Sequence, residues 1–383
     1  MATTKTVGTD KDYSTLQGWE DWADGQASAA QWAEVYGPDD VGPCIVAGWT
    51  GTPDADNYPR IYVPYAERGD GTTTYSSGAY CITTAANSGT AVWVQENYTR
   101  IEGLIAYSAR ASNGVFFSYG MTEVLFDGCV VVCGATHTLP GFYLYRKAAG
   151  TVNVYLSNCI AYGCGIVGAF CYGIYGECNQ GVLNVVIENC STDGWDDGGI
   201  CATQNTGSPN TGQTNATITG CISGNNTGGD YVRGHVSTSM TVTYCLSEDA
   251  TADDWGGAGN VAGATWANTI TTAGSNLALK NILSPAVDAS VDPGFTNDAL
   301  NDTGRRPKRD GYDMGALELG EDALYTRVQV VVRNVAYDSA KVLTEANITT
   351  LCGTINDALD AVSDLTFSHI EMQCRRDDDT PGS

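Results

Sequence analysis

The segment Val185-Val-Ile-Glu-Asn-Cys190 decides the fold, because near-copies of it recur along the chain. Each copy has apolar residues at alternate positions, then one or two small or polar residues, then a cysteine or leucine, and then another short apolar run. The copies cover Thr99–Leu104, Val124–Cys129, Val154–Cys159, Val185–Cys190, Ala216–Cys221 and the looser Thr241–Cys245. Their last residues are 25, 30, 31, 31 and 24 residues apart. A period of this length is typical of a repeat protein.

A second series runs in phase with the first, and each of its members begins with a glycine. The members are Gly114-Val-Phe, Gly141-Phe-Tyr, Gly168-Ala-Phe-Cys171, Gly198-Gly-Ile-Cys201 and Gly229-Asp-Tyr. Two short segments rich in Val, Ile, Thr and Tyr in every period predict a coil of strands that stacks on itself. The alternation excludes helical repeats, and the period is too short for a propeller blade of about 40 residues. A parallel β-helix remains.

The fourteen cysteines fit such a coil as packing residues. Successive turns of a β-helix lie about 4.8 Å apart, so equivalent inward residues form a ladder through the core. Cysteine behaves as a small, buried hydrophobe, which suits this place. One predicted structural ladder comprises Cys129, Cys159, Cys190, Cys221 and Cys245, and a second contains Cys171 and Cys201. The same spacing falls within the Cα range of disulfides, so oxidation of these thiols stays an alternative.

The amino-acid composition limits the classes of partner that the protein is expected to bind. The chain has 383 residues, 43% of them hydrophobic, and 44 Asp and Glu against 19 Lys and Arg give a net charge of -25. This charge predicts no nucleic-acid partner, because phosphate binding needs clustered basic residues. No apolar stretch reaches the length of a membrane span, so no membrane insertion is expected. The first residues lack the apolar segment of a signal peptide, which predicts synthesis in the cytoplasm.

The two ends of the repeat region carry a resemblance to a known superfamily. Val7-Gly-Thr-Asp-Lys-Asp-Tyr-Ser-Thr-Leu16 leads into a helix that Ser14 or Asp12 can cap, with Leu16, Trp19 and Trp22 on one face. Ser284-Pro-Ala-Val-Asp288 and Asp313-Met-Gly-Ala-Leu-Glu318 lie at the other end. These segments resemble the entry and the closing turns of pectate-lyase-like right-handed β-helix proteins. The resemblance implies the fold and the hand of the coil over residues 1–320. That fold hosts lyases, hydrolases, adhesins and phage proteins.

We therefore predict an all-β protein, a right-handed parallel β-helix with an N-terminal helical cap and a small C-terminal α/β domain. The predicted parts are an N-terminal cap and entry at 1–60, the β-helix at 61–320, and a β-α-β attachment or oligomerisation domain at 321–383. A strand, helix and strand of this size bury little apolar surface alone. The last part is therefore expected to pack on the coil or on another subunit, which predicts a homo-oligomer such as a trimer.

The candidate site is an acidic corner formed by residues 193–197, 229–235 and 253–257. Eight carboxylates lie between residues 191 and 258, with Arg233 as the one basic residue. Stacking is expected to bring Asp196 or Asp197, Asp230, and Asp253 or Asp254 together. Like charges at such range repel unless a cation or a raised pKa relieves them.

Three interpretations of the acidic corner stay open. It can be a solvated acidic turn; it can hold calcium through Asp197, Asp230 and Asp253; or it can bind and cleave a glycan. In the third case Trp195, Tyr231 and Trp255 form the glycan-binding surface, and the catalytic candidates are Asp196, Asp197, Asp230 and Asp254. The resemblance implies a lyase that pairs calcium-binding Asp residues with a basic residue, yet Arg233 stands alone here. No cofactor is required beyond this calcium hypothesis.

The favoured function is that of a structural virion protein of a tailed bacteriophage, a head fibre, decoration protein or tail-associated β-helix. Its expected partners are other virion proteins, copies of itself and a host cell-surface polysaccharide, and its expected location is the virion. Catalysis is not the favoured interpretation. The alternatives are a polysaccharide depolymerase, a glycoside hydrolase or lyase that uses the acidic corner, and a secreted, extracellular β-helix adhesin.

Overall fold

The computed structural model describes residues 2–317 except 38–39, 69–80, 85–89, 109–113, 135–138, 164–169, 206–210, 237, 281–283, 288 and 293–311. The chain divides into two compact units, residues 1–321 and 322–383. The predicted C-terminal domain at 321–383 and much of the predicted closing region lie outside the described residues.

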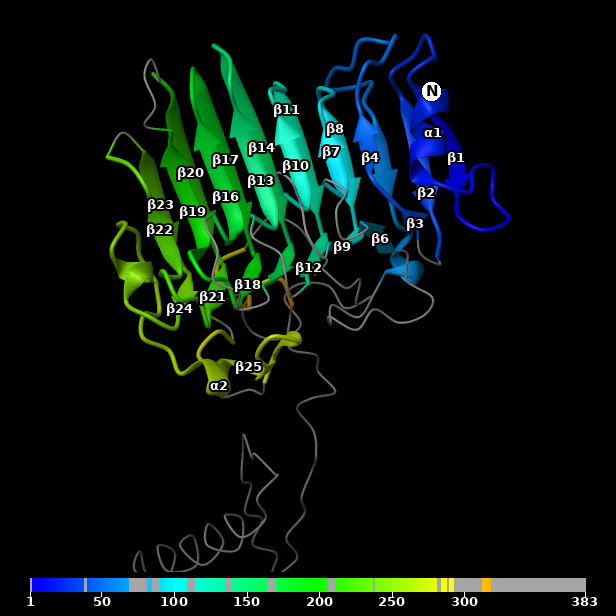
Figure 1. Ribbon diagram of the computed structural model, residues 1–383. Coiled ribbons are helices and arrows are strands. Elements are labelled where there is room, and N and C mark those ends of the chain that lie inside the picture. Colours follow the sequence, from blue (N-terminus) through cyan, green and yellow to red (C-terminus); the bar gives the residue numbers. More distant parts are fainter. Residues whose placement is uncertain are drawn as a thin grey trace, which may run out of the picture. The chain divides into compact units, whose positions relative to one another are not determined.

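The first unit is a right-handed parallel β-helix, which confirms the predicted fold (Figure 1). Each complete turn of the coil, here called a rung, contributes one strand to each of three parallel sheets in the order A, B, C; the first described rung contributes β1 to sheet A alone, and the last contributes strands to sheets A and B. Within the described residues sheet A has nine strands, and its middle rungs hold the longest of them. They are β1 (Thr3–Val7), β2 (Gln31–Val35), β5 (Arg60–Tyr62), β8 (Thr99–Glu102), β11 (Glu123–Asp127), β14 (Thr151–Ser157), β17 (Val182–Glu188), β20 (Gln213–Thr219) and β23 (Ser239–Thr243).

Sheets B and C complete each rung. The strands described for sheet B are β3 (Asp40–Val41), β6 (Cys81–Thr84), β9 (Ile105–Ser108), β12 (Val130–Cys133), β15 (Ile160–Tyr162), β18 (Ser191–Asp193), β21 (Ile222–Gly224) and β24 (Leu246–Ser247). Those described for sheet C are β4 (Cys44–Val46), β7 (Val92–Val94), β10 (Phe116–Tyr119), β13 (Phe142–Arg146), β16 (Tyr172–Cys178), β19 (Gly198–Gln204) and β22 (Tyr231–Arg233). Neighbouring strands in every sheet come from successive rungs.

The chain turns from sheet A to sheet B at a residue with a positive φ, directly before each cysteine of the ladder. These residues are Gly128 (60°), Asn158 (54°), Asn189 (48°), Gly220 (65°) and Tyr244 (51°). Glycine and asparagine adopt this left-handed conformation at the lowest cost, which explains the recurring Gly-Cys and Asn-Cys pairs. Tyr244 departs from this preference in the last and loosest copy of the repeat.

The five cysteines after these turns form a column in the core. All five are fully buried. The backbone N–H of Cys159 donates to Sγ of Cys190 at 3.4 Å, that of Cys190 to Cys221 at 3.3 Å, and that of Cys221 to Cys245 at 3.3 Å. The described cysteines are free thiols. Their role in the structure is the one that the repeat predicts, a small side chain next to a tight turn.

The predicted second ladder of Cys171 and Cys201 is wrong. The register of β16 and β19 places Cys201 opposite Tyr175, on the outer face of sheet C. Cys171 lies one residue before β16, and its carbonyl accepts the backbone N–H of Asp197 at 3.0 Å. Cys171 thus precedes its strand whereas Cys201 lies within its strand, so the two cysteines are not at equivalent positions.

The coil begins earlier than predicted. Strand β1 already pairs with β2, so the first rung starts at Thr3, inside the predicted cap region 1–60. Helix α1 (Leu16–Ala23) lies in this region and buries Leu16 and Trp19. Its N-cap is Thr15, whose hydroxyl accepts the Gly18 N–H at 3.1 Å, in place of the predicted Ser14 or Asp12. The helix covers the apolar interior of the first rung, as a solenoid end requires.

The remaining described elements lie outside the three parallel sheets. They are the 3-10 helices η1 (Tyr65–Glu67) and η2 (Thr251–Asp253), helix α2 (Trp266–Thr269), and the antiparallel strands β25 (Ile270–Thr272) and β26 (Asn276–Leu279). Trp266 Nε1 donates to the buried Asp193 Oδ1 at 2.9 Å, and the Leu277 N–H donates to the Tyr162 hydroxyl at 3.1 Å. These two bonds hold the β25–β26 hairpin on sheet B.

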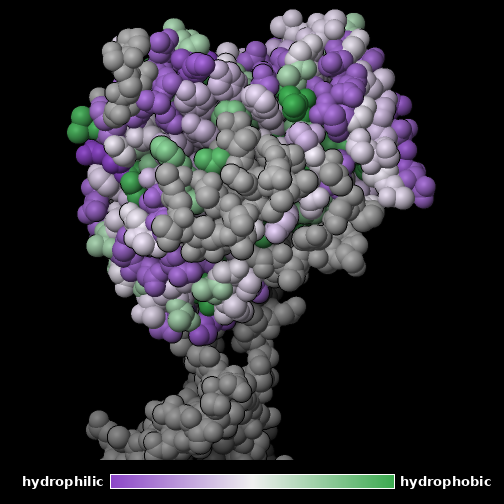
Figure 2. Space-filling model, in the orientation of Figure 1, coloured by the Kyte–Doolittle hydropathy of each residue, from purple (hydrophilic) through white to green (hydrophobic). Residues whose placement is uncertain are grey.

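The described surface is polar rather than densely charged. In Figure 2 most coloured residues are hydrophilic or neutral, and hydrophobic ones form small separate spots. On the outer face of sheet A, Asn153, Asn184 and Asn215 stack in register, each linked to the next by an amide hydrogen bond of 2.9 Å. Among the helices of the described residues, none is long and apolar enough to cross a membrane.

Candidate functional site

Asp230 is a deeply buried carboxylate of the acidic corner, with only 1% of its surface exposed. Its Oδ2 accepts the backbone N–H groups of Glu248 at 2.7 Å and Asp249 at 3.1 Å, and its Oδ1 accepts Asn226 Nδ2 at 2.7 Å. Burial raises the pKa of Asp230 to about 7, against these hydrogen bonds, which lower it. Asp230 thus joins the turns of two successive rungs and faces the protein interior.

The other predicted carboxylates do not gather around Asp230. Asp197 lies on the preceding rung opposite Gly228, and its Oδ2 accepts the Cys171 N–H at 2.7 Å. Asp196 is half-buried beside it, whereas Asp253 and Asp254 are exposed at η2. The acidic neighbour of Asp230 is instead Asp249, whose Oδ2 accepts the Asp230 N–H at 3.1 Å. The predicted juxtaposition is corrected in this respect, because the register places Asp230 opposite Gly199, two residues after Asp197.

Asp197, Asp230 and Asp253 do not fit a calcium ion. The carboxylate oxygens of Asp230 and one oxygen of Asp197 already accept N–H groups. In the described part of the chain, no three His, Cys, Asp or Glu side chains are arranged to hold a metal.

Two of the three aromatic residues predicted to bind a glycan are core residues. Trp195 is 2% exposed and donates its Nε1 to the Ala161 carbonyl at 3.1 Å. Tyr231 is fully buried, and its hydroxyl lies 3.1 Å from the carbonyl oxygens of Cys221 and Leu246. Neither ring presents a face to solvent, so the glycan-binding prediction for these two is corrected. Trp255 is partly exposed, but the Arg233 guanidinium lies over its ring at 4.6 Å.

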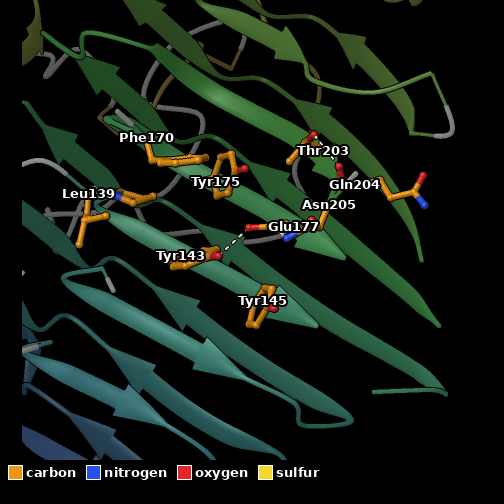
Figure 3. Close-up of a pocket in the computed structure, with 10 residues that line it drawn as sticks. Leu139, Tyr143, Tyr145, Phe170, Tyr175, Glu177, Thr203, Gln204 and Asn205 are labelled. Carbon is orange, nitrogen blue, oxygen red and sulfur yellow. Dashed lines mark hydrogen bonds between the residues drawn. The ribbon is translucent and has the colours of Figure 1, made fainter. Parts of the chain in front are cut away.

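A cavity of about 510 Å³ lies elsewhere, on the outer face of sheet C. Its side chains come from β13, β16 and β19 and from the segments that enter or leave these strands (Figure 3). The lining residues are Leu139, Pro140, Tyr143, Tyr145, Phe170, Tyr175, Glu177, Thr203, Gln204 and Asn205. Its volume is in the range of small-ligand pockets, and its lining combines aromatic rings with a few polar groups.

Strand register assembles this pocket. Tyr143 lies opposite Tyr175, and Tyr145 lies opposite Glu177, which in turn lies opposite Thr203. These residues alternate along their strands with the inward Phe142, Leu144 and Ile174, so they all face outward. The outward rings of Tyr143 and Tyr175 continue a column of tilted rings that begins with Trp93 and Phe117 on earlier rungs, with centroids 5.1–5.6 Å apart.

The polar end of the pocket is built around Glu177. Its Oε2 accepts the Tyr143 hydroxyl at 2.6 Å, and its Oε1 accepts Asn205 Nδ2 at 2.7 Å (Figure 3). Burial and the Glu177 carboxylate raise the pKa of Tyr143 far above its usual value, so the phenol keeps its proton and donates it. The pKa of Tyr175 is raised by the same two causes. Each carboxylate oxygen thus has one donor from the protein and keeps further acceptor capacity.

The other end of the pocket is apolar and is marked by Phe170. This residue has a φ of 73°, which is costly for a bulky side chain, and its ring is 55% exposed. The ring stands edge-on to Tyr175, with centroids 6.2 Å apart. Figure 3 shows Phe170 and Leu139 at one end of the pocket and Thr203, Gln204 and Asn205 at the other. This conformation places the exposed Phe170 ring beside the buried Tyr175 ring.

Comparisons with known proteins add one structural likeness. No protein-family model matches the chain. No curated protein matches it either. Among solved structures, the crystal structure of pectate lyase Pel9A is similar, with a TM-score of 0.36 and 11% sequence identity over 83% of this chain and 97% of that chain. At this level the likeness carries no argument about activity or substrate, so function rests on the site itself.

The pocket was not predicted from the sequence, although the sequence contains a pattern that indicates it. Phe142-Tyr-Leu-Tyr-Arg146 and Ile174-Tyr-Gly-Glu177 each place a polar or aromatic side chain at every second position. An offset of 32 residues aligns Tyr143 with Tyr175 and Tyr145 with Glu177. The clustering of acidic residues does not indicate this pocket, because the pocket contains one carboxylate and lies outside the acidic corner.

Proposed function

We propose that the protein binds a glycan in the pocket on sheet C. The observation that carries the proposal is the pairing of an exposed aromatic end, Phe170 with Tyr175, with a hydrogen-bonding end, Glu177 with Asn205. Sugars present apolar C–H faces that pack on aromatic rings and hydroxyl groups that donate to carboxylates and amides. A pocket with both kinds of surface at opposite ends suits one or two sugar units.

The proposal concerns binding and not cleavage. Glycoside hydrolysis in its usual form uses two carboxyl groups on either side of the bond that breaks. The ten lining residues include one carboxylate, Glu177, and both its oxygens already accept hydrogen bonds from Tyr143 and Asn205. The depolymerase and its catalytic candidates in the acidic corner remain a separate prediction.

Replacement of Phe170 by Ala tests the aromatic end. We expect Phe170→Ala to weaken glycan binding about tenfold, because an aromatic contact and its buried area are lost. The measurement is isothermal titration calorimetry with a glycan identified on an oligosaccharide array. Tyr155→Ala is the matched control, since Tyr155 is 37% exposed on the outer face of sheet A. Equal affinity of Phe170→Ala and the wild-type protein would remove Phe170 from the site, and binding of no glycan by the wild-type protein would refute the proposal.

The proposal also covers the kind of particle or surface on which this glycan binding takes place. We infer that the protein is a structural component of a tailed-phage particle that attaches to a host polysaccharide. A stiff coil with a polar surface and a side pocket for sugars suits such a particle, and it equally suits the alternative, a secreted adhesin. Immunogold labelling of purified phage particles is the deciding experiment. Labelled particles are expected, and unlabelled particles together with labelled bacterial surfaces would favour the adhesin.

A further inference from the structure

We propose that the pocket on sheet C selects uncharged sugars over sugars that carry a carboxylate, and that Glu177 sets this preference. The inference rests on the proposed glycan binding and adds the class of ligand. Glu177 is the one charged side chain among the ten residues that line the pocket. It is 7% exposed and belongs to the polar end, where ligand hydroxyl groups are expected to bind.

The protein groups that touch Glu177 leave its negative charge in place. Tyr143 donates a phenol O–H at 2.6 Å, and Asn205 donates an amide N–H at 2.7 Å. Both donors are neutral. They orient the carboxylate without an opposite charge, so an approaching ligand meets a fixed anion in a partly desolvated place.

The basic residues in the described strands of sheet C are engaged away from the pocket. Arg146 lies on β13, and its guanidinium donates to the carbonyl oxygens of Gly120, at 2.8 Å, and of Ala149. Arg233 lies on β22 and stacks on Trp255 at 4.6 Å. Neither lines the pocket. A uronate carboxylate would therefore find no cation among the lining residues to balance it.

The size of the effect follows from Coulomb's law. Repulsion between two like charges about 6 Å apart, at the effective dielectric constant of a protein surface, lowers the affinity for the ligand roughly tenfold to hundredfold. Salt screens this repulsion in the open part of the pocket, so discrimination should weaken as ionic strength rises. The net charge of -25 repels anions as well, but it acts on every face of the protein and not on this pocket alone.

The test compares matched ligands that differ in one charge. The panel contains oligosaccharides of glucose, galactose, mannose and N-acetylglucosamine, together with the same oligosaccharides oxidised to carboxylates at C6. Dissociation constants are measured by calorimetry at low and at high salt. We expect the neutral form of the ligand to bind at least tenfold more tightly than its carboxylate form, with a smaller ratio at high salt.

Two variants assign the preference to Glu177. Glu177→Gln keeps one acceptor for Asn205 and offers an N–H to Tyr143, so the local contacts survive while the charge is lost; the ratio is expected to fall at least threefold. Glu188→Gln removes the same charge from the outer face of sheet A, at a half-buried residue of β17, and the ratio is expected to stay as in the wild-type protein.

The outcomes separate this inference from the proposed function. Equal or tighter binding of the carboxylate form by the wild-type protein overturns the inference and leaves glycan binding in place. An unchanged ratio in Glu177→Gln, or an equal fall in Glu188→Gln, overturns the role of Glu177. Binding of no panel member in either form overturns the proposed function, and the inference with it.

Discussion

Phe142→Ala is expected to lower the free energy of unfolding by about 3–5 kcal/mol, the usual cost of removing a large buried ring. Phe142 is fully buried in the inward column of sheet C. Its ring stacks on Phe116 with centroids 5.1 Å apart and planes 9° apart, and it meets Phe126 of sheet A edge-on at 5.8 Å. Its loss leaves a cavity between two sheets, which neighbouring rungs cannot close because their strands are fixed by pairing on both sides.

Chemical denaturation followed by circular dichroism measures this loss. Tyr155→Ala is again the control, because its ring lies on the outer face of sheet A and its removal should change the free energy by less than about 1 kcal/mol. Similar losses in both variants would contradict the packing described here. Phe142 is the neighbour of the pocket residue Tyr143 but faces the core. Glycan affinity should therefore fall in Phe142→Ala only if β13 loses its structure.

Asp230→Ala is expected to destabilise the protein by about 3 kcal/mol, because buried hydrogen-bond donors lose their acceptor. The donors are the backbone N–H groups of Glu248 and Asp249 and the side-chain amide of Asn226. The Asn226 side chain cannot simply turn to another acceptor, because its Oδ1 already accepts the backbone N–H of Trp195 at 2.9 Å. The measurement is again the free energy of unfolding, and the exposed Asp254→Ala should cost less than about 0.5 kcal/mol.

The pH dependence of this difference identifies Asp230 as its source. Its pKa is about 7 in the folded protein, and the pKa of an unfolded aspartate is about 3.9. Between these values the folded state holds a proton that the unfolded state has lost, so this contribution to stability is complete below about pH 4 and is lost as pH rises through about 7. The gap between wild-type and Asp230→Ala should therefore narrow over this range. A gap that widens with pH would contradict the raised pKa.

The repeat predicted the coil because its turn chemistry is local. Asn158, Asn189 and Gly220 each precede a ladder cysteine, and the conformation that they adopt depends on two or three residues. The same pattern failed for Cys171 and Cys201, because the connections from sheet B to sheet C differ in length between rungs. Spacing from a glycine then no longer fixes which face a side chain takes.

The candidate site was predicted incorrectly for a similar reason, because the register between rungs was not known. Placing Asp230 beside Asp197 or Asp253 required the register between rungs to be known to one residue, and the structure shows Asp230 turned inward toward Asp249 instead. The pocket needed similar knowledge, since Tyr145 meets Glu177 only through pairing of β13 with β16. The alternation in the sequence indicates which residues face outward. It does not indicate that these residues, and not the clustered carboxylates, form the pocket.

The left-handed turn before each ladder cysteine bears on how the length of the coil can change. Each rung with a ladder cysteine carries its own turn residue and its own small core residue, and the strands of the central rungs, with ladder steps of 30 or 31 residues, pair with the rungs directly before and after them. Duplication or deletion of a complete rung would therefore keep the strand pairing between the remaining rungs. The coil is in this sense adjustable in length, in steps of about 4.8 Å.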